Sequence, residues 1–262
     1  MHDGLQAGIR EKPRHRFDGT TWRQETSQVV EESPVTLFVN GSEYVTAAVT
    51  SIDLKDWVVG FLAGEQIISR TSDISIFQWW PDDNQIWVRV PGFHPQPANS
   101  RYLGSCCGQS RPGFFNPSGI AQLPSTLTLQ ISELQETFAR LSAWSRGQHS
   151  GGLHMAGLAQ GGALLLARAD VGRHNALDKL YGATLREQPT AFDKSYVLFS
   201  GRLSAEIVWK VRTMGVQAIV SNAAPTSLGI ELADTVGITL IGFLRDSEMS
   251  VFSHPSRLTS YP

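Results

Sequence analysis

From about residue 150 onward, short apolar runs alternate with segments of helical periodicity, and this alternation limits the possible folds more than any other feature. Three runs have the length and apolar content of buried strands: 196–200, 218–221 and 238–244. The two segments between them, 204–214 and 228–236, show helical periodicity, and each is followed by a glycine. Strand–helix–strand units of this kind predict an α/β fold with a mainly parallel sheet that is covered by helices on both faces.

Ligands of such sheets bind beyond the carboxyl ends of the strands, so the residues at those ends are candidate binding residues. Arg173 and His174 follow a glycine at a predicted helix start, where free N–H groups and cationic side chains suit phosphate. Arg202, after the strand 196–200, is a second candidate anion contact. Asp170 either holds Arg173 in place or faces a ligand. Capping and packing are the alternative roles of Arg173 and His174.

The amino-terminal half has a different pattern, which predicts a smaller α+β unit. Two apolar runs flank Asn40-Gly41 as a hairpin, and a helix follows, with Asp53 as its cap. A Trp-rich strand pair completes the unit. The expected organisation is a polar, disordered tail at 1–28, a small α+β domain at 29–125 that ends in a cysteine loop, and an α/β domain at 126–262. A capping box at Ser132 predicts the first helix of the larger domain.

The only two cysteines, Cys106 and Cys107, are adjacent and lie between glycines in a loop rich in Gly, Ser, Gln and Pro. Such a loop is typically exposed, which favours chemistry over packing. Two thiols cannot complete a zinc site, which needs about four ligands. A thiolate in a flexible loop can instead accept sulfur from one partner and pass it to another. The alternative is that both thiols are incidental.

Charge and hydropathy exclude several classes of protein. The formal net charge of −2 gives no electrostatic footprint for general binding to nucleic acid or to a membrane surface. Residues 1–30 are polar and no later apolar run approaches 18 residues, so neither a signal peptide nor a membrane span is expected. Adjacent cysteines also argue against a disulfide-built secreted fold. The expected location is the cytoplasm.

Several long motifs occur in one order along the chain: VNGSEYVTAAVTSIDLKDWVVGFLAGEQII, SGGLHMAGL, ADVGRHNALDKLYG, SGRLSAEIVWKVRTMG, VSNAAPTSLGIELA and GITLIGFLRDSEMSVFSHPSRL. Together they resemble the formate dehydrogenase accessory sulfurtransferase family, FdhD, over about residues 28–258. The resemblance implies a cytoplasmic homodimer whose larger domain has the cytidine deaminase-like fold. It also implies transfer of persulfide sulfur from a cysteine desulfurase to the molybdenum (or tungsten) bis-guanine-dinucleotide cofactor of formate dehydrogenase.

The resemblance gives roles to individual residues. Family members commonly have Cys-Gly-x-Cys-Gly in the cysteine loop, whereas this chain has Ser105-Cys106-Cys107-Gly108. Aligning the Ser-Cys start makes Cys106 the persulfide carrier, which we favour, and aligning the Cys-Gly end makes it Cys107. One segment matches the family's cofactor-binding segment: Phe243, Leu244, Arg245, Asp246, Ser247 and Glu248. The cofactor is then a bound substrate, with GDP as its fragment, and no structural metal is expected.

Two other functions compete with sulfur transfer. A zinc deaminase shares the implied fold, but its chemistry needs His or Cys beside a Glu base and a Pro-Cys-x-x-Cys pair, and neither motif is present. A non-catalytic chaperone could bind the cofactor for formate dehydrogenase without using the cysteines. Sulfur transfer is favoured because it gives the cysteine loop a role.

Overall fold

The structure, a computed structural model, describes residues 8–95, 102–103, 121–124, 126–146, 152–188, 192–245 and 248–259. Its strands are β1 (Ile9–Phe17), β2 (Trp22–Val30), β3 (Ser33–Val39), β4 (Ser42–Val49), β5 (Ile76–Trp80), β6 (Gln85–Arg89), β7 (Tyr102–Leu103), β8 (His154–Gln160), β9 (Ala163–Asp170), β10 (Tyr196–Phe199), β11 (Ala218–Ser221), β12 (Thr239–Arg245) and β13 (Glu248–Ser253). Its helices are α1 (Leu54–Gly64), α2 (Ile131–Arg146), α3 (Arg173–Glu187), α4 (Ala205–Met214) and α5 (Ser227–Val236), with 3-10 turns at Thr71–Asp73, Phe192–Lys194 and Pro255–Arg257.

The larger sheet has six strands in the order β13-β12-β11-β10-β8-β9. Its centre, β10 to β12, is parallel as predicted, whereas β8, β9 and β13 pair antiparallel with their neighbours. The sheet is therefore mixed rather than mainly parallel. Hairpins account for two of the antiparallel pairs: β12–β13, and β8–β9, whose turn holds Gly161 and Gly162 at positive φ angles of 52° and 74°. A hairpin adds its two strands antiparallel to each other.

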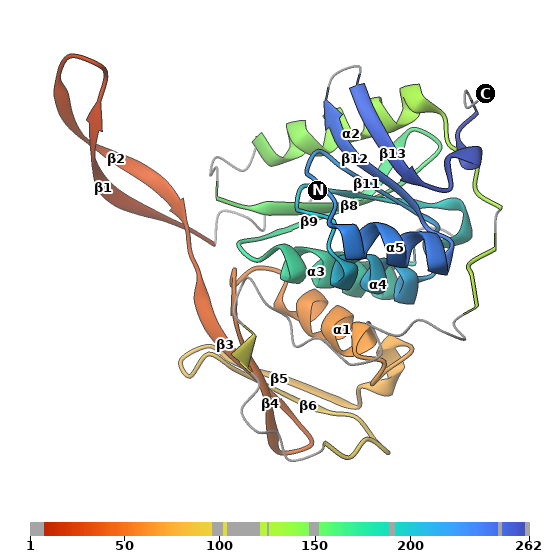
Figure 1. The fold of residues 1–262 in the computed structure, drawn as a ribbon. Helices are drawn as coiled ribbons and strands as arrows, with labels where there is room; N and C mark the ends of the chain where they lie inside the picture. The colour runs from red at the N-terminus through yellow and green to blue at the C-terminus, as the bar shows by residue number, and fades with distance from the viewer. Residues whose placement is uncertain are drawn as a thin grey trace.

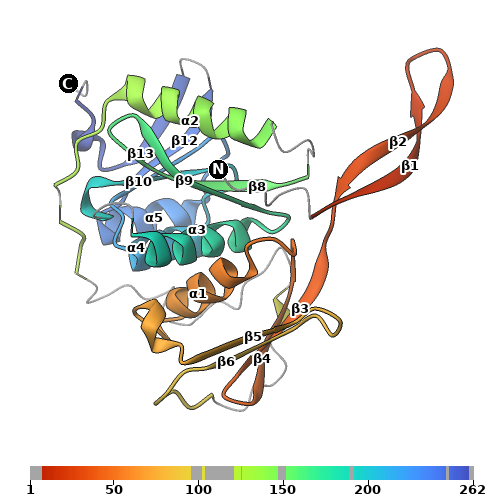
Figure 2. The same cartoon turned by 180° about the vertical axis from the view of Figure 1, so that it is seen from behind.

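Helices cover both faces of this sheet, with α2 on one face and α3, α4 and α5 on the other (Figures 1 and 2). Alternate side chains of β10 explain how both faces are filled, because successive residues of a strand point to opposite faces. Tyr196 and Leu198 belong to the apolar cluster under α2, whereas Val197 and Phe199 belong to the cluster under the other helices. The three-layer α/β architecture predicted for the larger domain is confirmed.

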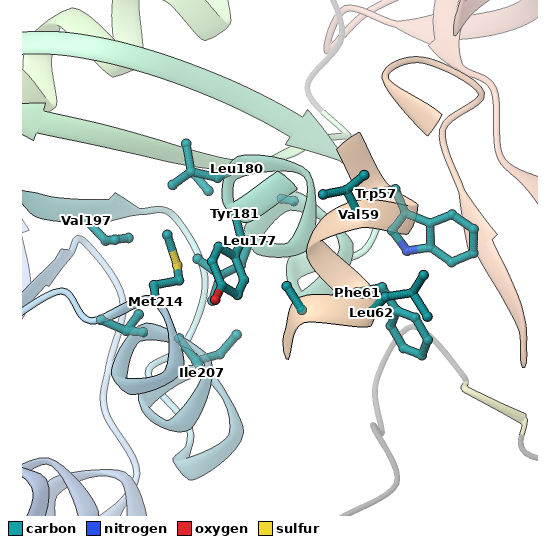
Figure 3. Close-up of a cluster of buried hydrophobic side chains, with 14 of the residues drawn as sticks. Trp57, Val59, Phe61, Leu62, Leu177, Leu180, Tyr181, Val197, Ile207 and Met214 are labelled. Atoms are coloured by element: carbon teal, nitrogen blue, oxygen red, sulfur yellow. The ribbon is translucent and has the colours of Figure 1, made fainter. Parts of the chain in front are cut away.

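The smaller sheet has the order β5-β6-β3-β4-β7, and α1 lies between it and the helices of the larger domain (Figure 1). The sequence predicts that the apolar face of α1 packs on the hairpin 35–49. In the structure nine of its eleven residues are buried, with Lys55 exposed and Gly64 half-buried, because α1 also packs against α3. Figure 3 shows α1 side chains and α3 side chains in one cluster that extends to β10 and α4. One apolar core therefore crosses the boundary predicted at residue 125, and the division into domains stays a prediction.

Two glycines set the distance between α1 and α3. A Cβ added at Gly60 would lie 1.8 Å from the carbonyl oxygen of Asp178, and one added at Gly182 would lie 1.9 Å from that of Asp56. Each helix thus has a glycine where the other helix presents a backbone carbonyl. The two backbones are in direct contact because neither side carries a side chain at the crossing.

Asp178 lies at the same crossing, and its carboxylate forms a buried ion pair with Lys210 of α4. Burial raises the pKa of Asp178 to about 6 from 3.8. The folded protein therefore binds more protons than the unfolded chain between these two values, so this group's contribution to stability falls as pH rises from about 4 to about 6.

We expect wild type to lose up to about 3 kcal/mol of stability relative to Asp178→Asn when the pH rises from 4 to 7. Urea unfolding of both proteins across this range measures the difference. A constant difference between the two proteins would contradict the raised pKa.

Residues 9–30 form an exposed two-stranded arm, β1–β2, that projects away from the body (Figures 1 and 2). The sequence predicts a disordered tail over 1–28, which is wrong for the residues of this arm. Alternating charges allow cross-strand ion pairs, such as Arg14 with Glu25 at 2.6 Å, and a turn closes at Gly19 with a φ of 101°. Phe17 and Trp22 pair beside that turn, with Trp22 70% exposed.

Two predicted helix caps differ from those observed. Asp53 stands before α1 but makes no capping hydrogen bond, and its carboxylate lies 3.6 Å from Arg168 Nε instead. Ser132 lies inside α2, because that helix already begins at Ile131. Thr226 caps α5 by accepting a hydrogen bond from Gly229 N at 3.1 Å.

Candidate functional site

The structure brings the predicted loops to one edge of the larger sheet. The strands β10, β11 and β12 are parallel, and β9 runs in the same direction because it is antiparallel to β8, which is antiparallel to β10. The carboxyl ends of all four strands therefore lie along one edge. We call this the carboxyl edge.

Arg173 stands at the centre of this edge as the first residue of α3, with Gly172 as N-cap. A Cβ added at Gly201 would lie 2.8 Å from Phe199 Cε1 and 3.1 Å from Arg173 Cβ. The absence of a side chain at Gly201 thus lets the half-buried Arg173 pack beside the end of β10. Arg202, which follows Gly201 in the chain, is exposed.

Hydrogen bonds join the loops that follow β10 and β11 to the last residues of β12. Ser221 Oγ donates to Gly201 O at 2.9 Å and accepts from Ala223 N at 3.0 Å. Phe243 N donates to Ala223 O at 3.2 Å. These hydrogen bonds connect Gly201, which lies beside Arg173, to Phe243 through Ser221 and Ala223.

The end of β12 presents an aromatic ring at the carboxyl edge. Phe243 has a positive φ of 56°, unusual for an aromatic residue, and is 43% exposed. Its ring centroid lies 6.1 Å from that of Phe252. Leu244 is buried, and Arg245 and Glu248 are exposed on either side of the turn. Asp246 and Ser247, which the sequence predicts at this turn, lie outside the described residues.

His174 joins the first turns of two helices, with its Nε2 3.0 Å from Oε2 of Glu206 on α4. Burial lowers the pKa of His174, so the ring is neutral near pH 7. The adjacent His174 ring lowers the pKa of Glu206. His174 thus orients the helix starts beside Arg173.

His154 also lies at this edge, although the sequence favours a core histidine over a ligand at this position. Its place on an apolar strand predicts a core histidine, yet it is the first residue of β8 and pairs with Asp170 in the β8–β9 register. Burial lowers its pKa, and so does the positive charge of Arg173. Counting residue pairs outward from the Gly161-Gly162 turn gives the register of β8 and β9. That count could have placed His154 opposite Asp170 from the sequence.

Asp170 lies beneath the edge rather than on it, because its side chain is fully buried. Its Oδ2 accepts hydrogen bonds from Thr50 and lies 2.6 Å from Lys179 Nζ, and its Oδ1 accepts from Gly172 N at 2.8 Å. Both oxygens therefore have several donors inside the protein. Both sequence-based roles of Asp170, holding Arg173 in place or facing a ligand, stay predictions.

Cys106 and Cys107 lie outside the described residues, but the start of their segment is placed. The strand β7 pairs in parallel with β4, with Leu103 opposite Ala47. Chain geometry keeps the Cα of Cys106 within about 11 Å of that of Leu103. The next residue of β4, Ala48, accepts a hydrogen bond at 2.8 Å from Asn175 in the first turn of α3.

Two features are absent from the described part of the chain. No group of three or more His, Cys, Asp or Glu side chains there is placed to hold a metal ion. Within the same residues, no helix is both long enough and apolar enough to cross a membrane.

Comparison with known proteins gives consistent results. The family model "FdhD/NarQ family" matches residues 30–259. A relative from Staphylococcus aureus (strain MRSA252), named sulfur carrier protein FdhD, is 36% identical over 255 residues, which cover 94% of this chain and 95% of the relative. A relative of the same name from Shouchella clausii (strain KSM-K16) is 38% identical over 241 residues, 88% of this chain and 89% of the relative.

A solved structure agrees as well. The crystal structure of a protein from Desulfotalea psychrophila, described as a formate dehydrogenase accessory protein, has a TM-score of 0.78 and 26% sequence identity. The match covers 95% of this chain and 99% of that protein. The resemblance seen in the motifs is thereby confirmed, and the chain belongs to the FdhD/NarQ family.

Proposed function

We propose that this protein is a sulfurtransferase that accepts persulfide sulfur from a cysteine desulfurase on Cys106. It passes that sulfur to the molybdenum (or tungsten) bis-guanine-dinucleotide cofactor that formate dehydrogenase requires. The relatives' names support sulfur carriage, and the Desulfotalea protein's description supports an accessory role toward formate dehydrogenase. The observation that carries the proposal is the pairing of β7 with β4, which begins the cysteine segment close to the first turn of α3.

The first chemical step is an exchange without net oxidation. The Cys106 thiolate attacks the terminal sulfur of the donor persulfide, the donor S–S bond breaks, and the donor cysteine leaves as a thiolate. Cys106 then carries the sulfur as a persulfide. In the second step that S–S bond breaks, Cys106 leaves as a thiolate, and the metal centre of the bound substrate takes up the sulfur while giving up two electrons.

The carboxyl edge supplies the contacts for the substrate. Three arginines lie at this edge: Arg173 at the start of α3, Arg202 after β10 and Arg245 at the end of β12. Each can bind a phosphate through charge-assisted hydrogen bonds. The exposed ring of Phe243 can stack on a guanine base. The ends of β10 and β12 are two strand spacings apart, about 10 Å, so the phosphates and base of one nucleotide can reach both. GDP is therefore a suitable probe of the site.

We expect Arg173→Ala to weaken GDP binding roughly ten- to a hundredfold, because a charge-assisted phosphate contact contributes about 1.5 to 3 kcal/mol. Isothermal calorimetry with GDP measures the change, and ADP tests the role of the base. Arg140→Ala is the matched control, since Arg140 lies on α2 across the sheet and pairs with Glu136. No GDP binding by wild type, or binding untouched by Arg173→Ala and Arg202→Ala, would refute the proposed site.

The proposal also includes partners. Besides the desulfurase and formate dehydrogenase, a second copy of the chain is expected, because the family resemblance implies a homodimer. Sedimentation velocity of the purified protein measures its mass in solution, and a monomer at micromolar concentration would contradict this part of the proposal.

A further inference from the structure

His154 occupies a place at the carboxyl edge that the proposed function does not use. It is the first residue of β8, and β8 is antiparallel to β9 and β10, so its start lies beside their carboxyl ends. His154 is paired with Asp170, and the side chains of directly paired residues lie on the same face of a sheet. Ala156 and Leu158 follow on that face and belong to the apolar cluster beneath α3, α4 and α5. The ring of His154 therefore lies on the face that α3 covers.

The end of β10 is fastened to the start of β8. Met155, the neighbour of His154, donates from its N–H to Ser200 Oγ at 2.8 Å and accepts at its carbonyl from Ser200 N at 3.0 Å. The next residue, Gly201, leaves room for Arg173, because an added Cβ would lie 3.1 Å from Arg173 Cβ. His154 and Arg173 are thus both placed against the turn that follows β10.

The end of β9 also leads from His154 to Arg173. Asp170, opposite His154, accepts a hydrogen bond at 2.8 Å from the N–H of Gly172, which is the N-cap of α3. Arg173 is the next residue, so two residues separate it from Asp170 along the chain. His154 therefore flanks the first turn of α3, and Arg173 begins that turn.

The His154 ring lies at the boundary between the core and the solvent. It is half-buried, whereas Ala156 and Leu158 on the same face are fully buried. Burial lowers the pKa of His154, the positive charge of Arg173 lowers it further, and Asp170 raises it. The ring is therefore neutral near pH 7 as long as no anion lies beside it.

The other charged groups of β9 and α3 near this ring are held in ion pairs. These pairs are Asp170 with Lys179 at 2.6 Å, Arg168 with Asp56 at 2.8 Å, and His174 with Glu206 at 3.0 Å. On the other neighbouring strand, β10, and at Ser200 after it, no residue carries a charge. Of the charged groups, Arg173 has the largest effect on His154.

A phosphate bound by Arg173 would change the charge beside His154 from positive to negative. An anion close to a histidine favours the protonated ring, and a protonated ring can donate hydrogen bonds from both nitrogens. The N–H groups in the first turn of a helix favour an anion at the same place. The corner between β8, β9 and α3 thus combines an arginine, helix N–H groups and a histidine.

We propose that His154 is a further binding residue of the carboxyl edge: when a phosphate group binds at Arg173, His154 takes up one proton from solution and donates a hydrogen bond to that phosphate. This inference rests on the proposed function, because the phosphate belongs to the substrate site proposed above. Since a proton is gained on binding, the contribution of His154 to affinity is largest at low pH and falls as the pH rises.

Calorimetry with pyrophosphate and with GDP, in buffers of different ionisation enthalpy, counts the protons taken up on binding. His154→Gln keeps a hydrogen-bond donor but cannot be protonated, and titration of the probe itself is common to both proteins. We expect wild type to take up about half a proton more than His154→Gln at pH 7, and to bind about tenfold more tightly at pH 6 but less than about threefold more tightly at pH 8. His15→Gln, on the exposed strand β1, is the matched control and should behave as wild type.

Proton NMR of the ring C–H groups follows His154 directly, and its signal is assigned by its absence from His154→Gln. We expect the titration of His154 to move to higher pH when pyrophosphate is added to wild type, and to move much less in Arg173→Ala. His154→Asn replaces His154→Gln in both experiments if the glutamine variant has a lowered melting temperature.

The outcomes separate this inference from the proposed function. A His154 titration that moves with neither anion, or equal proton uptake by wild type and His154→Gln, would overturn the inference even where GDP binding depends on Arg173. A shift with pyrophosphate but no binding of GDP would support the inference and refute the nucleotide site. A protein that shows the proton uptake but accepts no sulfur from a desulfurase would refute the sulfurtransferase function alone.

Discussion

Replacing Cys106 with alanine is expected to lower sulfur transfer by more than about a hundredfold, because no thiolate then remains at the favoured position to form the persulfide. Cys107→Ala should retain most of the activity. The measurement is transfer of labelled sulfur from a desulfurase through the purified protein to the cofactor. Mass spectrometry of the loaded protein should find the added sulfur on Cys106.

The other outcomes each identify a different mechanism. Equal losses in the two variants would indicate a relay between the cysteines, and the reverse order would make Cys107 the carrier. A variant lacking both cysteines that still supports formate dehydrogenase activity in cells would favour the chaperone function. GDP binding should be unchanged in all three variants, since the carboxyl edge is built without these side chains.

Replacing Gly60 or Gly182 with alanine is expected to cost about 3 kcal/mol or more, or to prevent folding, because each added methyl group overlaps a backbone carbonyl of the opposite helix. The helices cannot relieve a separation of 1.8 to 1.9 Å by rotating a side chain, so α1 and α3 must move apart. Urea unfolding or soluble yield measures the loss.

Gly64 provides a control on the same helix. A Cβ added there would lie 3.7 Å from Asp178 Oδ1, an ordinary contact, so Gly64→Ala should change stability by less than about 1 kcal/mol. If Gly60→Ala unfolded at the same urea concentration as Gly64→Ala, the two helices would have room to separate, and direct backbone contact would not limit their packing.

The elements of the larger domain could be predicted because their signals are local. Apolar runs of four to seven residues became β10, β11 and β12, and Gly215 and Gly237 end α4 and α5 in the left-handed conformation that the sequence indicates. The helix start at Arg173 and its place at the carboxyl ends of the strands also followed from spacing alone. These features depend on residues within a turn or two of one another.

The features that the sequence did not indicate depend on distant residues. Asp170 is hydrogen-bonded to Thr50, which follows β4 of the smaller sheet. Gly60 is required only because α3 crosses α1 at that point. The arm was missed for a different reason. It buries almost no apolar surface, so hydrophobic periodicity does not reveal it, and its ion pairs appear only once the strand register is known.

The arm also offers a practical point of attachment. Each of its strands has nine residues, which at about 3.4 Å per residue places the turn at Gly19 some 30 Å beyond the arm's base. A peptide tag or fluorophore inserted at that turn would lie far from both sheets, and the chain could be immobilised there with the carboxyl edge left open to solution. Optical or surface-based assays of GDP and of protein partners could then be made on the intact chain.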